Sequence, residues 1–104
     1  MTAQEYTELA ETARVNGWNL RPEVIINVGE GIAAILKRRF PKSDTADLAP
    51  IQRAVRERAC ALLSDHKGNW PDRPRGEKRN FYEIITDDLL ISHNELFIAA
   101  LAKN

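Results

Sequence analysis

The apolar positions of this chain recur at steps of three and four residues, which is the spacing of one face of an α-helix. The strongest run lies between Pro22 and Pro41, and Gly29 and Gly31 fall inside it. Because its apolar stripe is wide, we expect a central helix covered on several sides, with the glycines marking close approach of a neighbouring backbone. The apolar positions of the run are Val24, Ile25, Ile26, Val28, Ile32, Ala33, Ile35, Leu36 and Phe40.

Two further helices are predicted on either side of this run. Thr2 and Glu5 have the spacing of a capping box, which predicts a helix over about residues 3 to 16 that stops at Asn16-Gly17. The segment 43–47 is dense in N-cap residues and precedes an apolar face that continues to Lys67-Gly68, so it predicts a third helix. That face consists of Leu48, Ile51, Val55, Ala59, Leu62 and His66.

The last quarter of the sequence leaves several alternatives open. Residues 81–85 fit either a short strand or a turn of helix, and Thr86-Asp87-Asp88 can cap a helix that begins beside them. Ser92 to Glu95 is a second match to the capping box, so a final helix is expected to begin at Asp87 or at His93. Residues 24–28 could likewise form a short strand in place of the first turns of the helix predicted there.

Length and composition then limit the fold. The chain has 104 residues, of which 43% are hydrophobic, and this suits one core rather than two. We therefore expect an all-α fold, a compact bundle of four to five helices with minor short-strand content possible, as a single domain over residues 1–104.

Several classes of site and compartment are not indicated. Cys60 is the single cysteine, so no intramolecular disulfide and no cysteine-based zinc site is expected. The first residues lack the pattern of a signal peptide, and no apolar run approaches the ~18 residues of a membrane span. We therefore expect a soluble cytoplasmic protein with no cofactor, no metal and no membrane partner.

Charge is unevenly distributed although it sums to zero. Residues 1–36 carry two basic and five acidic side chains, residues 37–79 carry twelve and six, and residues 80–104 carry one and four. The middle of the chain is therefore basic. In the folded protein these cations can pair with the acidic side chains of the two ends of the chain. They can also lie at the C-terminal end of a helix, where the helix dipole is negative, or face a partner.

The segment 67–79 is the leading candidate for a working surface. It is long for a connection in so small a domain, and it combines tryptophan and arginine, which are enriched at the energetic centres of interfaces. The hypothesis is a small non-catalytic binding protein, of the adaptor, inhibitor or immunity type, that engages a macromolecular partner, most simply an acidic protein surface. The alternative is that Trp70 does not bind a partner but folds back onto the core and anchors the loop. The candidate partner-binding residues are Trp70, Arg73, Arg75, Lys78 and Arg79.

A nucleic-acid-binding regulator is the alternative function. Arginines near aromatic rings are what phosphate contacts and base stacking require. The residues that would carry this role are Lys37, Arg38, Arg39, Arg53 and Arg56.

Other motifs are weaker. Gly29 to Ala34 fits the dinucleotide fingerprint without the parallel strands it needs, and Ala13 to Asn19 partly matches the turn of a helix-turn-helix. An enzyme hypothesis requires His66, His93 and the Asp87-Asp88 pair to meet in one cleft. The width of the central stripe also makes a homodimer possible.

Overall fold

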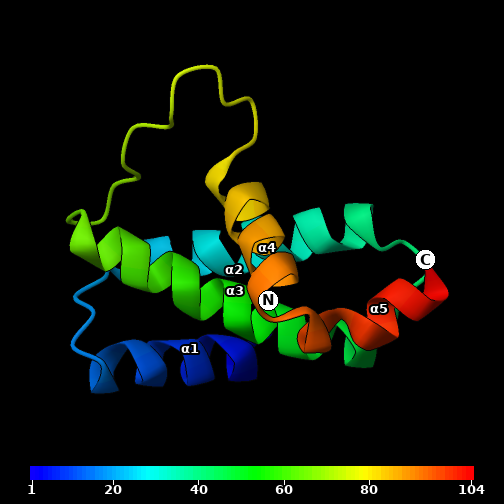
Figure 1. Ribbon diagram of the computed structural model, residues 1–104. Coiled ribbons are helices and arrows are strands. Elements are labelled where there is room, and N and C mark those ends of the chain that lie inside the picture. The colour runs from blue at the N-terminus through cyan, green and yellow to red at the C-terminus, as the bar shows by residue number, and fades with distance from the viewer.

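The computed structural model describes all 104 residues and contains five α-helices, one 3₁₀ turn and no strand (Figure 1). The predicted all-α bundle is confirmed, and both segments with a strand alternative, 24–28 and 81–85, are helical. The elements are α1 (Ala3–Val15), α2 (Pro22–Arg39), α3 (Thr45–Asp65), α4 (Phe81–Ser92), the 3₁₀ turn η1 (Asn94–Phe97) and α5 (Ile98–Lys103).

Three of the helices begin with the same reciprocal cap. In each, a side chain accepts from the backbone N–H three residues on, and the carboxylate at that later residue accepts from the cap's own N–H. Two donors that the helix leaves unpaired are satisfied at once. The pairs are Thr2 with Glu5, Asp44 with Asp47, and Asn80 with Glu83.

Helix α1 stops where the sequence predicts. Gly17 has a φ of 73°, and the N–H of Trp18 donates across the turn to the carbonyl of Ala13 at 2.8 Å. This is the Schellman arrangement, which favours glycine because the left-handed conformation strains a residue with a Cβ. The chain then reverses into α2.

The core is one cluster of 17 buried residues drawn from α1 to α4, η1 and α5, with Phe40 following α2. Helix α2 packs on α1, α3 and α4, as its wide apolar stripe requires. Helix α3 contacts every other element, so the centre of the fold is the α2–α3 pair (Figure 1). No helix is both long and apolar enough to cross a bilayer.

The predicted caps of the C-terminal quarter are wrong. Thr86 is buried in the middle of α4, where its hydroxyl donates to the Tyr82 carbonyl at 2.7 Å. Ser92 donates to the Asp88 carbonyl at 2.9 Å, and η1 has no side-chain cap. The cap at Asn80 starts the helix earlier and so places both later candidates inside it.

The two glycines of α2 meet side chains, and the expected backbone approach is wrong. A Cβ at Gly29 would overlap the sulfur of Met1, and one at Gly31 would overlap the ring of Tyr82. The missing side chains therefore make room for the N-terminus and for α4.

Exposed apolar side chains lie mostly near the C-terminus. Ile91, Ile98 and Leu101 are 82%, 67% and 51% exposed, whereas α2 leaves Ile26 exposed at 40%. Neighbouring helices thus cover most of the apolar stripe of α2. The width of that stripe therefore no longer argues for a homodimer.

Candidate interaction surface

The connection between α3 and α4, residues 66–80, stands away from the bundle and is named here the α3–α4 loop (Figure 1). Residues 72–76 at its tip are all exposed. A single turn shapes this part, in which the N–H of Glu77 donates to the Pro74 carbonyl at 3.0 Å. The loop is therefore exposed to solvent. The contacts at its two ends determine how firmly it is held.

Trp70 anchors the base of the loop. The indole is half-buried and packs against the hydrophobic core. Its ring stacks on Phe81 with centroids 5.1 Å apart and meets the edge of Tyr82 at 5.3 Å. This packing supports the anchoring role considered for Trp70, while its part in binding a partner stays a prediction.

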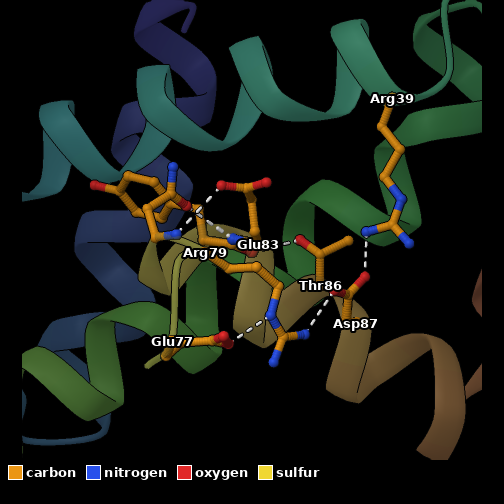
Figure 2. Close-up of polar contacts among 8 residues, drawn as sticks. Arg39, Glu77, Arg79, Glu83, Thr86 and Asp87 are labelled. Atoms are coloured by element: carbon orange, nitrogen blue, oxygen red, sulfur yellow. Dashed lines mark hydrogen bonds and ion pairs between the residues drawn. The ribbon is translucent and has the colours of Figure 1, made fainter. Parts of the chain in front are cut away.

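A chain of ion pairs holds the other end of the loop (Figure 2). Asp87 on α4 accepts from Arg39 of α2 through Oδ1 and from Arg79 through Oδ2, the latter at 2.8 Å. The Nε of Arg79 also donates to Glu77 at 2.6 Å. Arg73 donates to the Arg79 carbonyl at 2.9 Å. One carboxylate on α4 thus joins the end of α2 to the end of the loop.

The two arginines determine the ionisation of Asp87. Partial burial opposes its charge, but hydrogen bonds from Arg79 and Arg39 outweigh that and lower its pKa below the ordinary value. The same contact, together with the one to Glu77, raises the pKa of Arg79. Asp87 and Arg79 are therefore both charged at neutral pH.

Some of the candidate cations stay unpaired. Arg75 and Lys78 of the loop, and Lys37 and Arg38 at the end of α2, are exposed and make no side-chain hydrogen bond or ion pair within the chain. Arg38 borders a shallow hollow shared with Arg39 and Asp87. The paired Arg39 of α2 and Arg79 of the loop meet at Asp87, which borders the same hollow.

The remaining two nucleic-acid candidates lie elsewhere. The side chain of Arg56 is 7% exposed and pairs with Glu5 at 2.7 Å. Arg53 is exposed and lines a separate cleft between α1 and α3. The five cations of that hypothesis are thus divided between two places.

The groups of the enzyme hypothesis do not meet. His66 ends α3, and His93 ends α4 with its Nδ1 at 3.3 Å from Glu95. No group of three or more His, Cys, Asp or Glu side chains is arranged to hold a metal ion. Cys60 is fully buried, and burial raises its pKa to about 11, so its thiol stays protonated at neutral pH.

Comparison of the chain with protein-family models, with curated proteins and with solved structures found no match. Its function is therefore argued from its own geometry. Sequence reasoning misses the junction at Asp87 because the acidic pair 87–88 resembles a helix cap. It also misses the cleft between α1 and α3, which no local motif marks.

Proposed function

We propose that this chain is a non-catalytic binding protein that engages an acidic protein surface through the α3–α4 loop. The observation that carries the proposal is the contrast between the two parts of the loop. Its base is held by the stacking of Trp70 on Phe81 and by the pairing of Arg79 with Asp87. Its exposed positions include Arg75, at the tip, and Lys78, beyond it, and neither has a partner inside the chain.

A held loop favours tight association because less conformational entropy is lost when it docks. Arginine at the tip adds planar, multidentate hydrogen bonding to carboxylates. Lys78 adds a second positive charge nearby. Together these features fit an adaptor or inhibitor role better than a structural connection.

A protein partner is preferred to a nucleic acid because two of the five nucleic-acid candidates, Arg39 and Arg56, are paired inside the chain and the five do not form one surface. Arg39 and Arg79 share Asp87, and Arg56 is buried against Glu5. A nucleic-acid surface needs several cations free to replace counterions along a phosphate backbone. The two free cations of the loop, Arg75 and Lys78, are few and lie three positions apart in the sequence, which suits a compact acidic patch.

The proposal assigns no catalytic step to this surface. Asp87 and Glu77, the two carboxylates that hold the Arg79 end of the loop, each accept from an arginine. The hydrogen bonds from Arg79 and Arg39 lower the pKa of Asp87, which makes it a poor proton acceptor.

The test is photo-crosslinking from position 72, an exposed position at the tip, in the protein's native host. A photoreactive residue at 72 is expected to capture a defined protein, and the double variant Arg75→Glu with Lys78→Glu is expected to abolish that capture. The matched control, Arg14→Glu with Arg21→Glu, changes the net charge equally on exposed positions outside the loop and should leave the capture intact.

Two outcomes would contradict the proposal. Equal loss of capture in both double variants would show that net charge alone matters. Release of the captured material by nuclease, with an affinity that falls steeply with salt, would instead favour the nucleic-acid alternative.

A further inference from the structure

A cleft of about 350 Å³ lies between α1 and α3, away from the α3–α4 loop. This volume is at the lower end of the range for small-molecule sites. Leu9 contributes apolar surface, and the charged side chains that line the cleft include Glu8, Arg53, Arg56 and Glu57.

The charges in the cleft fall into a satisfied pair and an unsatisfied set. Arg56 and Glu5 pair with each other at 2.7 Å. Arg53 and Glu57 are one helical turn apart on α3, yet they form no ion pair with each other or with another residue. Glu8 accepts one hydrogen bond, from the amide of Gln4 at 3.3 Å. One guanidinium and two carboxylates thus remain available to a ligand.

Arg56 lines the cleft but is not open to a ligand. Its side chain is more than nine-tenths buried, and its terminal nitrogens donate to Glu5 and to the Gly29 carbonyl. Its Nε–H has no acceptor and is itself closed off from solvent, so a molecule in the cleft does not reach it. Arg53, which is exposed, is therefore the guanidinium of the cleft that a ligand can contact.

We propose that this cleft binds a small molecule that carries both a carboxylate and an ammonium group, that is, a free α-amino acid. The carboxylate pairs with Arg53, and the ammonium pairs with Glu57. The second free carboxylate, Glu8, favours an amino acid with a basic side chain, whose methylene groups pack on Leu9. This site is independent of the function proposed for the loop.

The test is a titration of the isotope-labelled protein with L-lysine, followed by NMR. Saturable shifts are expected at the amides of residues 8–12 and 52–57. Cadaverine, which lacks the carboxylate, and Nα-acetyl-lysine, which lacks the α-ammonium, are each expected to bind about tenfold more weakly or worse. L-Glutamate is expected to bind more weakly than L-lysine.

Variants of two side chains outside the core cluster locate the site without disturbing the core. Arg53→Ala and Glu57→Gln are each expected to weaken L-lysine binding by about tenfold. The control is Arg58→Ala, since Arg58 is an exposed arginine of the same helix that lines a different groove. It should bind like the unaltered protein.

The proposal is overturned by any of three results. These are the absence of saturable shifts with L-lysine, equal binding of cadaverine and L-lysine, and unchanged binding in Arg53→Ala. Because loop variants leave this cleft intact, failure here does not bear on the loop, and failure of the loop proposal does not bear on the cleft.

Discussion

The guanidinium of Arg56 donates to the carboxylate of Glu5 at 2.7 Å, across 51 positions of sequence. Its other terminal nitrogen donates to the Gly29 carbonyl at 3.2 Å. One side chain of α3 therefore joins the first turn of α1 to the middle of α2. Because Arg56 is almost fully buried, its charge depends on Glu5 for compensation.

Removing the charge of Glu5 is expected to destabilise the fold. Glu5→Gln keeps the capping box with Thr2, since glutamine serves at that position, but it leaves Arg56 buried and unpaired. Breaking a buried pair costs about 3–5 kcal/mol, and the partial exposure of Glu5 reduces this to about 2 kcal/mol. Urea unfolding measures the change. Glu11→Gln, which breaks an exposed pair with Arg14, is the control and should leave the midpoint nearly unchanged.

The pH dependence gives an independent check on the same pair. The hydrogen bond from Arg56 lowers the pKa of Glu5 from 4.5 to about 2. A carboxyl whose pKa is depressed in the folded state stabilises it above the ordinary value, and that stability is lost as the pH falls from 4.5 through about 2. The unaltered protein should lose about 2 kcal/mol from this group over the interval, and Glu5→Gln should not. Parallel curves for the two proteins would contradict the assignment.

Lys67, the second residue after the end of α3, lies in the left-handed region with a φ of 58°, where glycine is favoured. The next residue, Gly68, donates to the Leu63 carbonyl at 2.7 Å and completes the turn. Lys67→Gly is therefore expected to raise the free energy of unfolding by about 0.5–1 kcal/mol. Lys67→Ala keeps the strain and should give no gain. Equal stabilisation by both substitutions would show that the charge, and not the backbone, is responsible.

The first three helices could be predicted because each carries its signals locally. The cap at Thr2, the stop at Gly17 and the apolar steps of α2 and α3 all act within a few residues of the element they define. In α4 the predicted caps at Thr86 and Ser92 were wrong, although the true cap, Asn80 with Glu83, has the same local spacing. The burial of Thr86 in the core is a tertiary contact, which the sequence pattern around it does not show.

The candidate surface was predictable in its location but not in its pairing. The length and arginine content of residues 67–79 mark the loop in the sequence. The sharing of Asp87 by Arg39 and Arg79 depends on how α2 and α4 cross, and no local pattern encodes that crossing. The same reason hides the α1–α3 cleft, whose two walls lie about forty positions apart in the sequence.

Asp87→Asn is expected to loosen the α3–α4 loop while the bundle stays folded. The substitution removes the charge that holds Arg39 and Arg79 together, whereas Trp70 still anchors the other end. Limited trypsin digestion within the loop, after its exposed arginine and lysine residues, should therefore become faster. Asp88→Asn is the matched control, because Asp88 is exposed and forms no ion pair. Equal digestion of the two variants would show that Asp87 does not restrain the loop.

Substitutions at Trp70 and at Arg75 are expected to have different effects, the first on the stability of the fold and the second on partner binding. Trp70→Ala removes a half-buried ring from its stack on Phe81 and its edge contact with Tyr82, at a cost of about 2–3 kcal/mol. In a domain of this size the melting temperature should fall by about 4–8 °C for each kcal/mol. Arg75→Ala removes an exposed side chain without a partner, so its melting temperature should match that of the unaltered protein while crosslinking to the partner declines. An unchanged melting temperature in Trp70→Ala would show that the indole is not an anchor, and it would return Trp70 to the binding surface beside Arg75.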